Sequence, residues 1–213
     1  MNIHSPAAKQ LCRIDQTIFR LLYYLFFAFG VLALGYATYA VVDARVYQTV
    51  EESKIPAMRH NQEARVIAEG DVIGEMVIPR LEMKAVFVQG DSSRILRRAV
   101  GHIMETSLPG ETGNVVLTGH RDSFFRPLRN IRHGDAITLK TPEGDFQYEV
   151  ESTAVVAPTD VGVLRPSAEP TLTLITCFPF YYIGPAPKRF IVVARQVGRL
   201  PVRSGADGAY LPF

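Results

Sequence analysis

Two residues combine a reactive side chain with a position just after an apolar run. Cys177 closes the run TLTLITC, and the aromatic, proline-rich segment that follows it must turn. His120 comes directly after the run NVVLTG. A thiolate is the reactive form of cysteine, and a neighbouring imidazolium stabilises it. The pair therefore predicts nucleophilic acyl transfer, provided that the fold brings the two strand ends together.

Arg189 is the candidate for a third role, because it begins the apolar run that follows the Cys177 loop. A guanidinium carries up to five fixed donors and can hold a substrate carbonyl or the oxyanion that forms when a thiolate attacks. On chemistry alone, Arg121, Arg126 and Arg195 could serve equally well.

Cys177 also has a simpler interpretation, as a small apolar residue that closes the core, which is the commoner fate of a free cysteine. The other cysteine, Cys12, lies beyond the most apolar segment and is most simply inert, so no disulfide framework is expected. A four-ligand zinc site is hard to build from these two cysteines and five scattered histidines. We therefore expect no metal and no cofactor. The remaining histidines are placed less well than His120: His4, His60, His102 and His133.

The elements that must position these residues begin after Gly70, where runs rich in Val, Ile, Phe and Thr alternate with Gly, Pro, Asp and Asn. This spacing predicts a mainly β domain of seven or eight strands, as a sandwich or closed barrel and not as βαβ units. One short helix is expected after Asp91 or Ser92, a second helix or turn at 122–130, and a hairpin turn at 142–145. The strands are predicted at 72–78, 85–88, 114–118, 136–140, 146–157, 171–176 and 189–197.

An apolar segment precedes this domain, with no charged residue from Leu21 to Val42. As a helix it would be roughly 33 Å long, enough to cross a bilayer and too long for a cleaved signal peptide. Its N-terminal flank is more basic than its other flank, so the positive-inside tendency places the N-terminus in the cytoplasm. We therefore predict a single-pass protein of the cell membrane whose β domain is extracytoplasmic.

The predicted organisation has five parts: a cytoplasmic tail at 1–20, a transmembrane helix at 21–42, a stalk or frayed helix at 43–70, a catalytic β-barrel at 71–200 and a C-terminal tail at 201–213. The net charge is only +2, and the basic residues are scattered among acidic ones. This argues against nucleic-acid binding.

Several ordered motifs resemble sortases, and most of all the class D group: TLITC at 173–177, PGETGNVVLTGH followed by RDSFFRPLRNIRHGD up to 135, and KRF at 188–190. The resemblance covers roughly 74–196. It implies a closed eight-stranded sortase-type β-barrel with one or two short helices. It also implies that Cys177 is the nucleophile, His120 the catalytic histidine and Arg189 the catalytic arginine, whereas His102 matches a position that is not catalytic.

The resemblance further implies a reaction. Cys177 would attack the Thr carbonyl of a Leu-Pro-X-Thr-Gly-like sorting signal at the C-terminus of a secreted protein, and an amine would resolve the thioester. The amine would come from a peptidoglycan precursor or from a pilin-like lysine of another protein.

Two rival functions stay open: a hydrolytic cysteine protease and a silent membrane-tethered β-barrel adaptor. A metal-binding domain is the weakest alternative. The internal LPGETG at 108–113 resembles a sorting signal with one residue too many, and we predict that it is a turn.

Overall fold

The computed structural model describes residues 6–58, 67–182 and 184–200, without the side chains of 6–17, 58 and 200. The predicted C-terminal tail, the Cys12 side chain, His4 and His60 lie outside the described residues. The chain forms two compact units, Met1–Asp43 and Ala44–Phe213.

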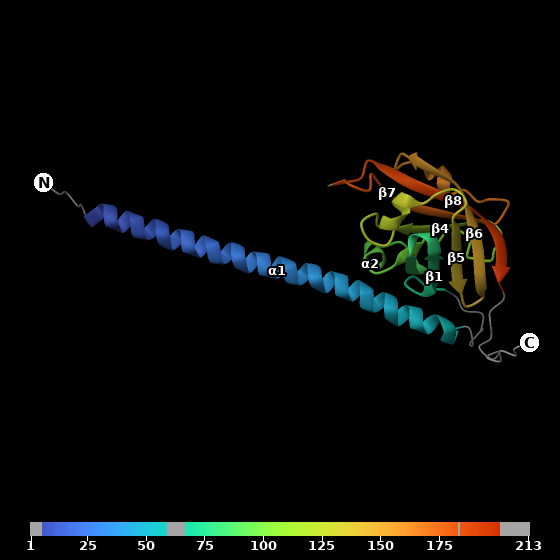
Figure 1. The fold of residues 1–213 in the computed structure, drawn as a ribbon, viewed down its shortest axis with the longest axis horizontal. Coiled ribbons are helices and arrows are strands. Elements are labelled where there is room, and N and C mark those ends of the chain that lie inside the picture. The colour runs from blue at the N-terminus through green and yellow to red at the C-terminus, as the bar shows by residue number, and fades with distance from the viewer. Residues whose placement is uncertain (1–5, 59–66, 183, 201–213) are drawn as a thin grey trace, which may run out of the picture. The chain divides into compact units, whose positions relative to one another are not determined.

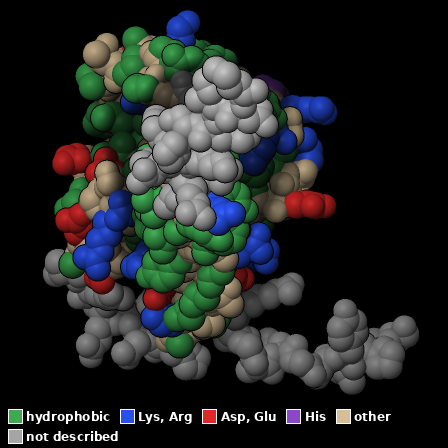
Figure 2. Space-filling view, turned by 90° about the vertical axis from the view of Figure 1, so that its left-hand side faces the viewer, with side chains coloured by type: hydrophobic (Ala, Val, Ile, Leu, Met, Phe, Trp, Pro, Cys, Tyr) green, Lys and Arg blue, Asp and Glu red, His purple; other side chains and the backbone are tan. Residues whose placement is uncertain are grey.

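Helix α1, Pro6–Met58, is 53 residues long. Its large apolar side chains are exposed from Ile18 to Val42, and hydrophobic side chains, in green, make up much of the face shown in Figure 2. The helix is long and apolar enough to cross a membrane, as predicted.

The second unit is a closed barrel of eight strands in the order β1-β2-β3-β4-β7-β8-β6-β5 (Figure 1). The predicted barrel is therefore confirmed. Closure leaves no sheet edge unpaired among these strands, and it encloses the core. The strands are β1 Val72–Ile78, β2 Met83–Gln89, β3 Val100–His102, β4 Asn114–Gly119, β5 Ala136–Thr141, β6 Gly144–Val156, β7 Thr171–Phe178 and β8 Lys188–Leu200.

Two of the eight strand pairs are parallel, β2 with β3 and β4 with β7, and the other six are antiparallel. The β4–β7 pair is the important one for function. Because parallel strands end at the same edge, the residues that follow β4 and those that end β7 lie at one end of the barrel.

The barrel encloses a core of apolar side chains. Large side chains from all parts of the barrel are fully buried, among them Phe87, Leu117, Tyr148 and Leu174. Burial raises the pKa of the Tyr148 phenol strongly, so that the hydroxyl stays neutral.

The last turns of α1 belong to the barrel unit. Gln48 accepts a hydrogen bond from the backbone N–H of Val86 in β2 and donates one to the carbonyl of Arg98, just before β3, both at 2.7 Å. Ile55 is 5% exposed and lies in a second apolar cluster with Val72, Val86, Val88 and Ala99. The first part of the segment predicted as a stalk or frayed helix is therefore part of α1, which ends at Met58 and contacts the barrel through Gln48 and Ile55.

Four short helices punctuate the barrel. The helix expected after Ser92 is a single turn, because the chain then enters β3, a strand that sequence reasoning missed. The turn expected at 122–130 contains a 3₁₀ helix, and the hairpin expected at 142–145 joins β5 to β6. The short helices are η1 Pro79–Leu81, α2 Ser93–Leu96, η2 Arg126–Asn130 and η3 Val161–Leu164.

Candidate active site

Cys177 is the penultimate residue of β7, a strand paired on both sides. Leu172, Leu174 and Thr176 alternate on the buried inner face of this strand. Cys177 therefore projects from the outer face, where its side chain is half-buried and its thiol is free. The structure places the thiol at an accessible position and not in the core.

Arg189 is the direct partner of Cys177 across the antiparallel β7–β8 pair. Directly paired residues project from the same face, with Cβ atoms about 4.5–5.5 Å apart. The Arg189 Nη1 donates to the backbone carbonyls of Lys188 at 3.1 Å and Ala186 at 3.4 Å. These contacts hold the guanidinium against its own loop and leave further donors on the same group.

His120 lies one step beyond β4. The last pair of the parallel β4–β7 ladder is Gly119 with Thr176, so the next residues along the two chains are His120 and Cys177. The Thr176 hydroxyl donates to the Gly119 carbonyl at 2.8 Å, which holds the two strand ends together at this point. His120 is exposed. The fold thus brings the three predicted residues to one end of the barrel, on adjacent strands.

The turn after His120 is fixed by backbone contacts and by one buried ring. The His120 carbonyl accepts hydrogen bonds from the N–H groups of Phe125 at 3.1 Å and Ser123 at 3.4 Å. The Phe125 ring is fully buried and packs against Gly119, where any Cβ would lie 3.1 Å from the ring. Glycine at this position lets Phe125 approach the backbone and so sets the direction in which the chain leaves β4.

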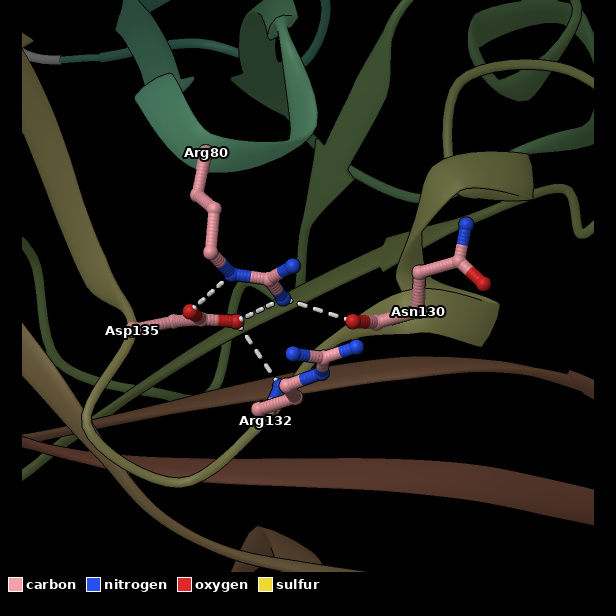
Figure 3. Close-up of polar contacts among 4 residues, drawn as sticks. All are labelled: Arg80, Asn130, Arg132 and Asp135. Carbon is pink, nitrogen blue, oxygen red and sulfur yellow. Dashed lines mark hydrogen bonds and ion pairs between the residues drawn. The ribbon is translucent and has the colours of Figure 1, made fainter.

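An ion pair fixes the far end of the same segment (Figure 3). Arg80 in η1 forms a bidentate pair with Asp135, just before β5, and also donates to the Asn130 carbonyl at 2.6 Å. Asp135 accepts a further hydrogen bond, at 2.7 Å, from the backbone N–H of Arg132. The hydrogen bonds from Arg80, and then the Arg132 N–H, hold the pKa of the Asp135 carboxyl below its ordinary value.

The aromatic residues of the segment between β7 and β8, residues 179–187, lie in two different environments. Phe180 and Phe190 pack against the core with ring centroids 5.3 Å apart, and Phe178 stacks on Phe190. Tyr181 and Tyr182 are 74% and 48% exposed and are not among the residues that pack on the core. Phe180 therefore packs the loop onto the barrel end, between the strand residues Phe178 and Phe190, whereas the two loop tyrosines stay largely exposed.

Register distinguishes the competing arginines. Arg195 pairs with the first residue of β7, at the end remote from Cys177, and forms an exposed ion pair with Glu151 at 2.8 Å. Arg126 is exposed in η2. Arg121 reaches the β7–β8 loop, a contact that the sequence did not reveal because it crosses between two loops. Among these candidates, the strand register sets only Arg189 opposite the thiol.

His102 is fully buried in β3, and its ring nitrogens are occupied. Nδ1 lies 2.8 Å from the Gln89 amide oxygen, and Nε2 lies 2.9 Å from the Ser107 carbonyl and 3.1 Å from the Thr106 hydroxyl. Burial lowers the pKa of His102, with partial opposition from the Ser107 contact. The residue holds the turn after β3 in place.

The internal LPGETG segment forms a turn, as expected. Glu111 donates its N–H to the Leu108 carbonyl at 3.1 Å, and its carboxylate accepts the Leu108 N–H at 2.8 Å. The Gly113 carbonyl accepts the N–H of Thr171, the first residue of β7. Cys177 lies six residues further on, roughly 20 Å along the strand. The segment is therefore at the wrong end of the barrel to meet its own thiol.

Within the described ranges, no group of three or more His, Cys, Asp or Glu side chains is arranged to hold a metal ion. A closed eight-stranded barrel with a thiol, an imidazole and a guanidinium at one end is thus the arrangement to compare with known proteins.

Residues 76–197 match the sortase domain family. Sortase D of Bacillus subtilis (strain 168) is 30% identical over an alignment of 187 residues, which covers 80% of this chain and 94% of that protein. A Clostridium perfringens sortase D5 transpeptidase has a similar structure, with a TM-score of 0.63 and 28% identity over 74% of this chain and 99% of that one. Sortase C from Clostridium perfringens SM101 is also similar, with a TM-score of 0.57 and 29% identity over 75% and 90% of the two chains.

The chain belongs to the sortase family, whose members are known as transpeptidases. The resemblance read from the motifs, class D sortases included, is confirmed.

Proposed function

We propose that this protein is a membrane-anchored cysteine transpeptidase that cleaves a Leu-Pro-X-Thr-Gly-like sorting signal and transfers the acyl fragment to an amine. The observation that carries the proposal is the strand register. Cys177 pairs with Arg189, and His120 follows the Gly119–Thr176 pair, so three side chains suited to acyl transfer project at one barrel end.

In the first half of the reaction, the Cys177 thiolate attacks the Thr carbonyl, and a bond forms between sulfur and carbon. Arg189 donates hydrogen bonds to the oxyanion that develops on the former carbonyl oxygen. The C–N bond then breaks, the His120 imidazolium gives its proton to the leaving amine, and a thioester remains on Cys177.

In the second half, the incoming amine attacks the thioester carbonyl. Neutral His120 accepts a proton from that amine, and the Cys177 thiolate departs as the new amide forms. Covalent catalysis thus divides one acyl transfer into two steps and holds the acyl group until an amine arrives.

The apolar helix gives the proposed location. With the N-terminus in the cytoplasm, as the flanking charges favour, the barrel faces the extracytoplasmic side of the cell membrane. Its donors are secreted proteins with a C-terminal sorting signal. Its acceptors are amines of a peptidoglycan precursor or a pilin-like lysine.

The test uses the full chain in detergent micelles with a library of Leu-Pro-containing peptides, followed by mass spectrometry. We expect a peptide thioester on Cys177, and a hydroxamate when hydroxylamine is the acceptor. Cys177→Ala should give neither product. If only the free acid forms with every amine offered, the protein is a hydrolytic cysteine protease instead.

A second readout separates the enzyme from a silent adaptor. A methanethiosulfonate reagent should label Cys177 and abolish turnover, because the half-buried thiol is both accessible and required. An unlabelled thiol together with no turnover of any library peptide would favour the adaptor.

A further inference from the structure

Arg121, the residue after His120, crosses from the β4 end to the loop between β7 and β8. Its Nη2 donates to the backbone carbonyls of Tyr182 at 2.8 Å and Gly184 at 3.2 Å. The two acceptors lie near the middle of the loop. The Arg121 guanidinium therefore joins the segment that carries His120 to the loop that Cys177 and Arg189 flank.

Two cation–π contacts join the same segments. The Arg121 guanidinium carbon lies 5.7 Å from the centroid of the Tyr182 ring, and that of Arg129 in η2 lies 5.5 Å from the Tyr181 ring. These distances are within the range of about 6 Å at which such contacts are attractive. They account for the orientation of two tyrosines that do not pack on the core.

The segment that carries His120 does not need Arg121 to hold it in place. Phe125 is buried against Gly119 at one end, and the Arg80–Asp135 pair fixes the other end (Figure 3). What Arg121 restrains is therefore the loop, which lies between two fixed strand ends.

Arg189 contacts the same loop nearer its C-terminal end, because its Nη1 donates to the Ala186 carbonyl at 3.4 Å. A change in the path of residues 184–186 would thus move the Gly184 acceptor of Arg121 and the Ala186 acceptor of Arg189 together. The loop backbone connects the two guanidinium groups mechanically.

We propose that Arg121 is a positioning residue: it ties the β7–β8 loop to the His120 segment, so that His120 and Arg189 are held in a common geometry around Cys177. The catalytic part of this inference rests on the proposed function. The tie itself can be tested without any substrate.

The first experiment is hydrogen–deuterium exchange on the full chain in detergent micelles. Arg121→Ala should increase exchange in peptides that cover the β7–β8 loop. Arg126→Ala is the matched control, since it removes an exposed arginine of the same segment whose side chain has no hydrogen bond, ion pair or ring contact among the described residues. If the two variants exchange alike in this loop, the tie is absent and the inference fails.

The second experiment measures kcat and KM for a Leu-Pro-X-Thr-Gly peptide with hydroxylamine as the acceptor. Small misplacement of reacting groups costs up to about 100-fold in rate. We therefore expect Arg121→Ala to lower kcat by about 10- to 100-fold, with little change in KM and no change for Arg126→Ala. Arg121→Lys should recover part of the loss, because the ammonium keeps the charge and can donate to one carbonyl at a time.

Other outcomes are equally decisive. The Nη1 of Arg121 is buried without a hydrogen-bond partner among the described residues. If this nitrogen bound a substrate carbonyl, the Arg121→Ala variant would have a higher KM and an unchanged kcat. That result would overturn the positioning role. A fall in the unfolding temperature for Arg121→Ala, with exchange raised throughout the barrel, would also overturn it. If the wild type turned over no peptide, the proposed function would fail, while the exchange contrast would still decide whether the tie exists.

Discussion

Cys177 and Arg189 lie opposite each other in a β7–β8 ladder that runs without a register shift from Thr171 to Phe178. The neighbouring β6–β8 ladder is shifted at two places, between Gln147 and Tyr148 and between Val150 and Ser152. The regular pairing fixes the guanidinium on the same face as the thiol.

The position of Arg189 predicts that its removal lowers kcat, whereas removal of an arginine elsewhere on the same strand does not. If Arg189 supplies an oxyanion donor, Arg189→Ala should lower kcat by about 10²- to 10³-fold. Arg195→Ala, on the same face of β8 but at the far end of the ladder, should keep wild-type kcat. Steady-state assays of peptide hydroxamate formation measure both, and equal losses in the two variants would contradict the assignment.

Gly119→Ala should disturb the site indirectly, through the contact between Gly119 and the Phe125 ring. The added methyl would lie 3.1 Å from the Phe125 ring, which is fully buried and has little space to move. We expect the variant to lose about 1–3 kcal/mol of unfolding free energy, the usual range for an overpacked core, and to lower kcat because His120 is displaced.

Gly198→Ala is the control for that variant, because its nearest neighbour would be the flexible Gln147 side chain at 3.2 Å. Thermal unfolding and peptide turnover, measured on both, should separate them. Equal stability of the two variants would mean that Phe125 does not set the path of the chain after β4.

The Arg80–Asp135 pair should contribute stability with a defined pH dependence. Asp135→Asn removes the charged partner of the guanidinium and should lower the free energy of unfolding. Because the folded-state pKa of Asp135 is lowered, the advantage of the wild type is complete above the ordinary aspartate pKa of about 4 and is lost as the pH falls through the lowered value.

Denaturant unfolding at several pH values between neutral and acidic conditions measures this difference. Glu151→Gln breaks the exposed pair with Arg195, and we expect it to lower the free energy of unfolding less than Asp135→Asn does. A stability gap between the wild type and Asp135→Asn that stays constant into strong acid would rule out the proposed linkage.

His102 should make the fold sensitive to mild acid. Burial lowers its pKa in the folded protein, so the unfolded chain binds a proton more readily. Stability from this group is therefore present above the ordinary histidine pKa of about 6.5 and falls as the pH drops below that value. Unfolding temperatures of the wild type and His102→Gln should converge as the pH is lowered, whereas exposed His133→Gln should follow the wild type.

The sequence supported much of the fold because each strand has its own apolar run and turn residues. It missed β3, since three residues, Val100–His102, are too few to show an alternating pattern and directly follow a helical signal. It also did not reveal that α1 continues to Met58 and packs on the barrel through Tyr47 and Ile55. The apolar residues of that part, Tyr47 and Ile55, are widely spaced among charged ones.

The spatial arrangement of the site was harder to predict than the identity of its residues. The sequence identified Cys177 and His120 as reactive residues at strand ends, but only a parallel pair of strands brings such ends together. The β4–β7 pairing that does so joins residues 57 positions apart, as in the Thr176–Gly119 hydrogen bond. No local pattern encodes that choice, which depends on closure of the whole barrel.

Arg121 and the Arg80–Asp135 pair illustrate the same limit. Each contact joins segments that meet only in three dimensions, and arginine is too common in this chain for its position to be informative alone. The family motifs supplied the assignment of Arg189 that residue chemistry had left open among four arginines.

The hydrogen bonds of Gln48 determine where the chain can be truncated to give a water-soluble fragment. A fragment that starts at Gly70 would lack Gln48 and Ile55 and would leave the apolar surface of Val72, Val86 and Val88 facing solvent. An expression boundary at Ala44, where the second compact unit begins, keeps that surface covered. The best truncation site therefore lies inside helix α1, upstream of the place where the β-rich sequence begins.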